Sequence, residues 1–248
     1  MIRKAICGGA LLIALAATAA AGTMVSYPSG SETVSGYLAL PEGAGKKPAV
    51  VVIQEWWGLN DFVRQKADGL AAQGYVALAP DLYRGKVATD PDTAHQLMRG
   101  MPEDRAMRDL KSAVAYLRTR SDVEPKKVGS IGWCMGGGYS LALAFAEPTL
   151  SGAVVYYGRL VTDRAVIADL RVPVLGNFGG RDEGIPVDMV EAFVRDAKQE
   201  GKAVDFKIYP EAGHGFASAA SSKSFRAEDA RDANARADSF LAKVLKGK

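Results

Sequence analysis

Short apolar runs alternate with amphipathic segments along most of this 248-residue chain. An apolar run bounded by turn residues is typical of a strand covered on both faces, whereas apolar residues three and four positions apart are typical of a helix with one buried face. Strands that alternate with helices need crossover connections, which place the strands parallel in one sheet with helices on both faces. The alternation therefore predicts an α/β fold with a mostly parallel central sheet.

The predicted elements follow one another in a regular order. Residues 24–41 are expected to form an edge strand or hairpin, and the further strands are 49–53, 75–79, 127–132, 152–157, 172–178 and 204–209. The helices expected between them are 61–73, 103–120, 138–147, 187–198 and a closing amphipathic helix, 224–245. Because neither a repeat nor a linker interrupts this order, residues 23–248 are predicted to form a single domain.

The first 22 residues have the order of a secretory signal peptide. Arg3 and Lys4 precede an apolar run over 5–17, and small residues follow up to position 22. The apolar run is short for a membrane span. We therefore predict that residues 1–22 are cleaved, and that the mature protein is periplasmic or secreted without a stable membrane anchor.

Composition narrows the possible partners. The formal net charge of +3 includes the two basic residues of the leader, so the mature chain is close to neutral and shows no sign of a nucleic-acid-binding surface. Cys7 leaves with the leader, so Cys134 remains as the one cysteine and is either a buried small residue or a reactive thiol. We expect no cofactor and no metal, and we favour a monomer.

The segment from Gly132 to Gly138 reads Gly-Trp-Cys-Met-Gly-Gly-Gly between a predicted strand and a predicted helix. A sharp strand-to-helix turn strains the residue at its apex, and side chains two positions away on either side would collide, so glycine is needed there. A thiol at a helix N-terminus faces backbone N–H groups and the positive end of the helix dipole, which favour the thiolate. Cys134 is thus a candidate nucleophile, although glycine-rich turns also serve packing or phosphate binding.

A nucleophile of this kind needs a base and an acid that orients the base. His214 lies in a glycine-flanked loop directly after the strand 204–209, whereas His95 lies in a polar helical stretch and is expected at the surface. Asp182 follows the strand 172–178, where the orienting acid of such a site is found, with Glu183 and Asp188 as alternatives. His214 and Asp182 are therefore the candidate base and orienting acid.

Glu55 follows the buried strand 49–53 and precedes two tryptophans. It lies on the side of the sheet where ligands of open α/β sheets bind, although a helix cap or a hydrogen-bonded loop residue is the alternative. The backbone N–H groups of Trp56 and Met135 are placed to form an oxyanion hole.

Together these motifs resemble the dienelactone hydrolase family of α/β-hydrolases, over nearly the whole mature chain. The resemblance implies the α/β-hydrolase fold and a triad of Cys134, His214 and Asp182. It also implies that Glu55 contacts the resting thiol and moves away when substrate arrives. Members that cleave dienelactone hold its carboxylate with arginines. Ser218 stands at one of these arginine positions, and Arg84 lies out of register with the other. The resemblance therefore implies the class of reaction but does not imply that dienelactone is the substrate.

The predicted function is hydrolysis of a small-molecule carboxylic ester or lactone through an acyl-enzyme on Cys134. Two alternatives stay open. One is a ligand-binding protein without catalysis on a hydrolase scaffold, and the other is a peroxide-sensitive thiol protein, which would not need His214. Neither the acyl group nor the leaving group is indicated by the sequence.

Overall fold

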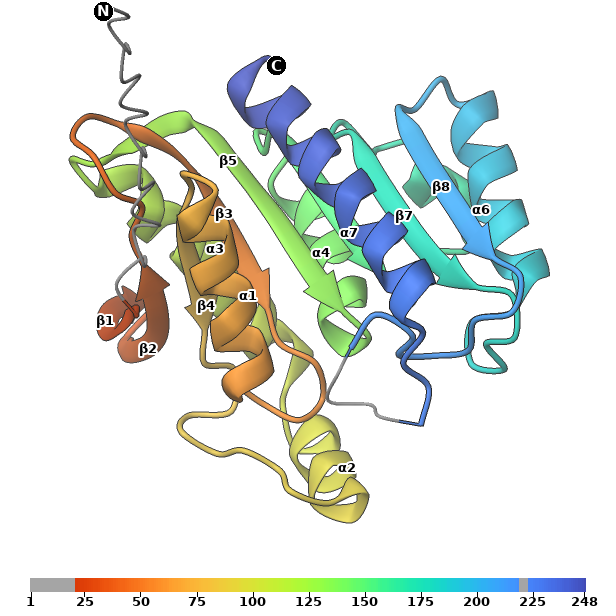
Figure 1. Cartoon of the computed structure of the whole chain (residues 1–248), viewed down its shortest axis with the longest axis horizontal. Helices are drawn as coiled ribbons and strands as arrows, with labels where there is room; N and C mark the ends of the chain where they lie inside the picture. Colours follow the sequence, from red (N-terminus) through yellow and green to blue (C-terminus); the bar gives the residue numbers. More distant parts are fainter. Residues whose placement is uncertain (1–20, 219–222) are drawn as a thin grey trace, which may run out of the picture.

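The computed structural model describes residues 21–218 and 223–248 (Figure 1). Residues 1–20, and with them nearly all of the predicted signal peptide, lie outside the described residues. The strands are β1 (Thr23–Ser29), β2 (Glu32–Ala39), β3 (Lys47–Ile53), β4 (Val76–Pro80), β5 (Val123–Trp133), β6 (Gly152–Tyr156), β7 (Val174–Gly179) and β8 (Val204–Tyr209). They form one sheet in the order β1-β2-β4-β3-β5-β6-β7-β8.

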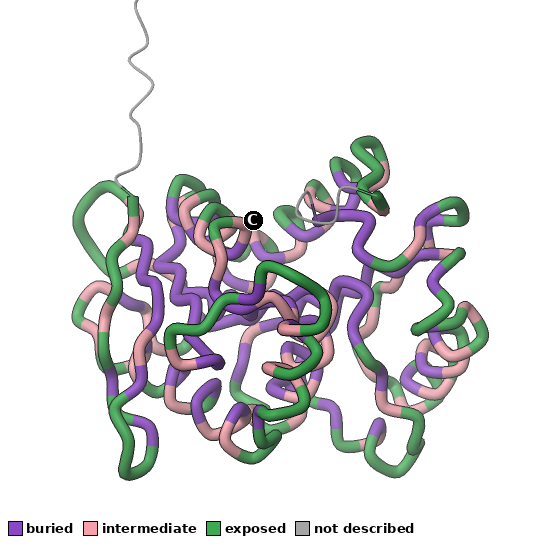
Figure 2. Tube along the Cα trace, turned by 90° about the horizontal axis from the view of Figure 1, so that it is seen from below, coloured by how far each residue is buried: buried purple, intermediate pink, exposed green. Residues whose placement is uncertain are grey.

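The sheet is mostly parallel, as predicted. β1 pairs with β2, and β2 with β4, in antiparallel fashion, so the predicted edge hairpin is present. All pairs from β4 across to β8 are parallel. The carboxyl ends of these strands therefore meet at one edge, which lies at the bottom of Figure 1 and faces the viewer in Figure 2.

Helices cover both faces of the sheet. They are α1 (Asp61–Ala72), α2 (Pro91–Arg99), α3 (Glu103–Thr119), α4 (Met135–Ala146), α5 (Arg164–Ile167), α6 (Val187–Gln199) and α7 (Ala227–Leu241), which continues as a π-helical turn (Ala242–Lys246). Apolar residues of α3, α4 and α6 pack in one core cluster and those of α1 and α7 in another. Successive residues of β3 contribute to the two clusters in turn, because side chains alternate across a strand.

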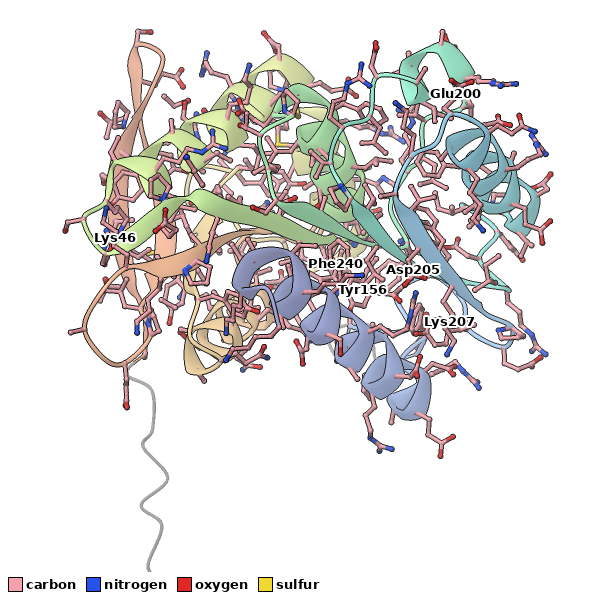
Figure 3. The ribbon with its side chains drawn as sticks, turned by 90° about the horizontal axis from the view of Figure 1, so that it is seen from above. Lys46, Tyr156, Glu200, Asp205, Lys207 and Phe240 are labelled. Carbon is pink, nitrogen blue, oxygen red and sulfur yellow. The ribbon has the colours of Figure 1, made fainter. Side chains whose placement is uncertain are left out.

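Polar contacts fix α7 on the outer strand β8. Arg236 pairs with Asp205 at 2.7 Å, and Lys207 pairs with Asp232 at the same distance. Figure 3 shows Asp205 and Lys207 on the side of β8 that faces this helix. The two elements on either side of the candidate histidine, β8 and α7, are thus paired with each other.

Three predicted elements begin three or more residues away from their observed starts, and most other boundaries differ by one or two residues. β5 begins at Val123 rather than at 127, the closing helix begins at Ala227 rather than at 224, and α4 begins at Met135 rather than at 138. The short helix α5 was not predicted, since four residues are too few to show a helical period. Among the residues described, no helix combines the length and apolar composition that a membrane span requires.

Candidate active site

Cys134 occupies the apex of the turn between β5 and α4, with φ 54° and ψ −119°. The glycines around it allow the backbone to approach closely. A Cβ atom at Gly132 would collide with the carbonyl of Gly136, and one at Gly136 would collide with the carbonyl of Ile53. Close packing thus requires glycine within the first turn of α4, which is why the helix begins before its glycines although glycine is a poor helix former.

The structure brings the three predicted triad residues together at the carboxyl edge of the sheet. The Sγ atom of Cys134 lies 3.0 Å from Nε2 of His214, and Nδ1 of the same ring lies 2.8 Å from Oδ2 of Asp182. The other oxygen of Asp182 accepts hydrogen bonds from the backbone N–H groups of Gly184 and Ile185. The carboxylate is therefore held in place while it orients the imidazole, and the alternatives Glu183 and Asp188 are not needed for this contact.

The charges of this cluster determine the protonation of the imidazole. Partial burial lowers the pKa of His214, but its hydrogen bonds to Asp182 and Cys134 and the charges of these partners outweigh that effect and raise the pKa from 6.5 to about 10. The ring therefore carries a proton at neutral pH. Its side chain is 42% exposed, whereas that of Asp182 is 1% exposed, so the imidazole is accessible from outside and its orienting acid is not.

An aromatic group that the sequence analysis did not assign supports the histidine. Tyr157 directly follows β6, is fully buried and has a positive φ of 37°. Its ring centroid lies 5.2 Å from that of His214 and 5.4 Å from that of Phe216. Two signals mark this position in the sequence. It is an aromatic residue at the end of a buried strand, which also describes many core residues, and it belongs to Tyr156-Tyr157-Gly158, one of the weaker motifs of the resemblance.

Glu55 lies where it was predicted, but its contact differs from the expectation. The expected bond to the resting thiol is absent from the described contacts. The thiol is paired with His214, and Oε2 of Glu55 accepts a hydrogen bond of 2.9 Å from the hydroxyl of Ser218. The reason is geometric: Ser218 follows His214 by four residues, and the turn between them brings its hydroxyl to the carboxyl group. Ser218 was noted in the sequence only as the place of a missing arginine.

Burial shapes the ionisation of Glu55. The residue is 2% exposed, and this burial raises its pKa from 4.5 to about 7 against the opposing effects of the Ser218 hydrogen bond and the charges of His214 and Lys66. A carboxyl group with this pKa exists in both protonation states near neutral pH.

The two residues of the predicted oxyanion hole belong to different elements. Met135 is the first residue of α4, and its sulfur accepts a hydrogen bond from the hydroxyl of Tyr83 at 3.4 Å. Trp56 lies in the loop after β3, where its ring packs 4.9 Å from that of Trp57 and 4.8 Å from that of the exposed His95 on α2. The use of the two backbone N–H groups for an oxyanion stays a prediction.

Arg84 points to the hairpin. Its guanidinium pairs with Asp109 at 2.8 Å and with Glu32 at 2.9 Å. The positive charge of Arg84 is therefore neutralised by two carboxylates of the protein, whereas binding of a ligand carboxylate would require an unpaired guanidinium.

The described parts of the chain can also be compared with the requirements of a metal site and of a ligand cavity. No group of three or more His, Cys, Asp or Glu residues within residues 21–218 and 223–248 is arranged to hold a metal ion. A cavity of about 650 Å³ lies between α7 and the strands β7 and β8, and another of about 450 Å³ lies between α1 and α7. Neither is lined by the triad residues.

A mostly parallel eight-stranded sheet with a sharp turn after β5 and with Asp182 and His214 in the loops after β7 and β8 is an α/β-hydrolase fold. The family model described as "Dienelactone hydrolase family" matches residues 34–245, and the chain belongs to this family.

Similar proteins agree with this placement. A Methylorubrum extorquens protein named "Putative carboxymethylenebutenolidase" is 35% identical over 222 residues, which cover 84% of this chain and 76% of the relative. "Protein usf" of Aquifex pyrophilus is 35% identical over 202 residues, covering 79% of this chain and 87% of that protein. A Klebsiella pneumoniae crystal structure titled "Putative Dienelactone Hydrolase" is 30% identical and superimposes with a TM-score of 0.82, covering 90% of this chain and 98% of that chain.

Proposed function

We propose that this protein hydrolyses a carboxylic ester or lactone through an acyl-enzyme on Cys134. The observation that carries the proposal is the continuous hydrogen-bonded path from sulfur through imidazole to a buried carboxylate, 3.0 Å and 2.8 Å long in its two steps. A path of this kind can take a proton from a nucleophile and return it to a leaving group. Membership of a hydrolase family supports the reaction class.

In the proposed reaction, the sulfur of Cys134 attacks the carbonyl carbon and a tetrahedral oxyanion forms. The N–H groups of Trp56 and Met135 stabilise that charge. The imidazolium of His214 gives its proton to the departing alkoxide, which leaves a thioester. Water then attacks the thioester with His214 as base, and the acid product leaves with the thiolate restored. Asp182 holds the imidazole in the required tautomer throughout.

The surroundings of the site favour a substrate without a carboxylate close to the scissile bond. Arg84 is engaged with Asp109 and Glu32, and Ser218 is buried against Glu55. Neither position supplies a free positive charge for an anionic substrate. We therefore propose an uncharged ester or lactone.

The proposal is tested on a panel of esters and lactones with activated and unactivated leaving groups. Wild-type protein should release one equivalent of leaving group in a burst and carry the acyl mass on the peptide that contains Cys134. The variant Cys134→Ala should show neither, and alkylation of one thiol should remove activity in proportion. Near-wild-type turnover by Cys134→Ala, or labelling without inactivation, would remove the nucleophile.

The two alternatives predict other outcomes of the same panel. A non-catalytic binding protein would bind panel compounds without cleaving any of them. A peroxide-sensitive thiol protein would leave the panel intact, and its Cys134 would be oxidised by peroxide at the same rate in wild-type protein and in His214→Ala.

We propose further that residues 1–22 direct export and are removed, which leaves a periplasmic or secreted protein, monomeric and without a membrane anchor. The order of charged, apolar and small residues supports this proposal. Protein recovered from the exporting cell should begin within a few residues of position 22 and elute as a monomer. An intact N-terminus in the cytoplasmic fraction would contradict it.

A further inference from the structure

The hydrogen bond between Ser218 and Glu55 connects two loops of the candidate site. Glu55 belongs to the loop after β3 and Ser218 to the loop that carries His214, and the two residues are 163 positions apart in the sequence. Ser218 is fully buried and Glu55 nearly so. A hydrogen bond to a carboxylate in such surroundings is stronger than one in water and costly to leave unmade.

The position of Ser218 is fixed relative to the imidazole. The backbone N–H of Ser218 donates to the carbonyl of Gly215 at 3.0 Å, and this turn begins directly after His214. Gly215 has a φ of 80°, a conformation that suits glycine. The turn therefore holds the serine hydroxyl and the imidazole of His214 in one rigid unit.

The backbone next to Glu55 packs on the turn that carries Cys134. The start of α4, next to Cys134, packs on the end of β3, since a Cβ atom at Gly136 would collide with the carbonyls of Ile53 and Gln54, the residues directly before Glu55. Glu55 and Cys134 also share a neighbour, since the charges of both act on the hydroxyl of Tyr157. A carboxylate that reaches the thiol can accept an S–H hydrogen bond, and a thiol bound in that way keeps its proton and does not attack. Within the described contacts, the carboxylate of Glu55 is hydrogen-bonded to Ser218, and the sulfur of Cys134 is hydrogen-bonded to His214.

We propose that Ser218 is a positioning residue that holds the carboxyl group of Glu55 away from the Cys134 thiol, so that the thiol is paired with His214 and ready to react before substrate arrives. The inference rests on the proposed function only in taking Cys134 as the reactive group. Three titratable groups act on Glu55 from other elements: His214 on its own loop, Lys66 on α1 and Tyr157 after β6.

The test measures the rate at which iodoacetamide alkylates Cys134 between pH 5 and pH 9, because this rate reports the free thiolate without any turnover. In Ser218→Ala the freed carboxylate should bind the thiol, so alkylation at pH 7 should slow at least fivefold and its pH profile should shift upward. Ser218→Thr keeps the hydroxyl and should restore the wild-type profile.

Two further variants separate positioning from a general loss of stability. Ser140 is also a buried serine, hydrogen-bonded to Ser130 at 2.8 Å, and Ser140→Ala should leave the alkylation profile unchanged. In a Glu55→Gln background no carboxylate is present to bind the thiol, so adding Ser218→Ala should change the rate less than twofold.

An unchanged or faster alkylation rate in Ser218→Ala would overturn the inference, as would an equal slowing in the Glu55→Gln background. The result is distinguishable from failure of the proposed function. If Cys134 were reactive but the protein cleaved no ester, the alkylation profiles would still follow the state of Ser218, whereas the ester panel would be negative.

Discussion

Two side-chain clusters in this molecule are each built around a buried aspartate but differ in chemistry. The first is the candidate triad of Cys134, His214 and Asp182. The second, the hairpin cluster, joins β1 and β2 to α3 and consists of Ser29, Glu32, Arg84, Arg108 and Asp109. Each has an aspartate whose side chain is 1% exposed, and each has a non-glycine residue in the positive-φ region, at 54° for Cys134 and 55° for Arg84.

The difference lies in whether a proton can move. Asp109 is bound by the guanidinium of Arg84 and the hydroxyl of Ser29, and arginine does not release its proton in proteins. Asp182 is bound by an imidazole whose second nitrogen faces a thiol, and an imidazole in this position can accept a proton on one nitrogen and release it again. Burial and backbone strain therefore do not by themselves mark a functional site, since the hairpin cluster has both.

The largest expected effect is the loss of kcat in Asp182→Asn, which the corresponding change at Asp109 should not cause. In Asp182→Asn the amide oxygen can keep the bonds from Gly184 and Ile185, but its NH₂ group then faces Nδ1 of His214 and forces the proton onto Nε2. The imidazole can no longer take the thiol proton, so kcat should fall by about 10³–10⁴ with little change in stability. Steady-state kinetics and denaturation of the same preparation check this, and a loss below tenfold would contradict the assigned role.

The corresponding change in the hairpin cluster should have the opposite outcome. Asp109→Asn removes the buried one of the two carboxylates that pair with Arg84, and this loss should cost about 3 kcal/mol of unfolding free energy. Turnover at saturating substrate should stay within about twofold of wild type, because no proton path is touched. Urea denaturation measures the first quantity and the ester assay the second. A fall in kcat comparable to that of Asp182→Asn would remove the distinction between the clusters.

The pH dependence of stability tests whether burial raises the pKa of Glu55, which lies beside the candidate triad and has no counterpart in the hairpin cluster. Its pKa rises from 4.5 to about 7 on folding, so the folded state binds the proton more tightly than the unfolded state does. The contribution of Glu55 to stability is therefore present below pH 4.5 and is lost as the pH rises through 7. Glu55→Gln lacks this titration, so its advantage over wild type should grow by about 2–3 kcal/mol between pH 4.5 and pH 8. Denaturation at both pH values checks the difference, and a constant difference would show that Glu55 is not perturbed.

The sequence was sufficient for the fold and for the identity of the clustered residues, because both follow from local patterns. Short apolar or alternating segments predicted the strands of the parallel sheet, and the prediction for β8 matches its full length. Cys134, Asp182 and His214 each follow a predicted strand, which placed them at one edge of the sheet. Residues that follow the carboxyl ends of parallel strands lie close together whatever their separation in sequence.

The contact between Ser218 and Glu55 could not be predicted from the sequence. No local pattern links Ser218 to Glu55, since each belongs to a loop whose path depends on the rest of the fold. The start of α4 was misplaced for a related reason: the low helix propensity of Gly136 argues against a helix, and only the packing against Ile53 shows why glycine is needed there.

The smallest expected effect concerns the backbone strain that the two clusters share. With φ 54° and ψ −119°, Cys134 adopts a conformation that disfavours any residue with a Cβ atom. Cys134→Gly should therefore be more stable than Cys134→Ala by about 1 kcal/mol, even though glycine loses more entropy on folding. The matched control is Ala142→Gly in the interior of α4, where the same exchange should cost about 1 kcal/mol. Chemical denaturation measures the change in unfolding free energy when alanine is replaced by glycine at each position. A gain at position 134 with a loss at position 142 would show that the turn holds the thiol under strain, whereas a loss at both positions would show that it does not.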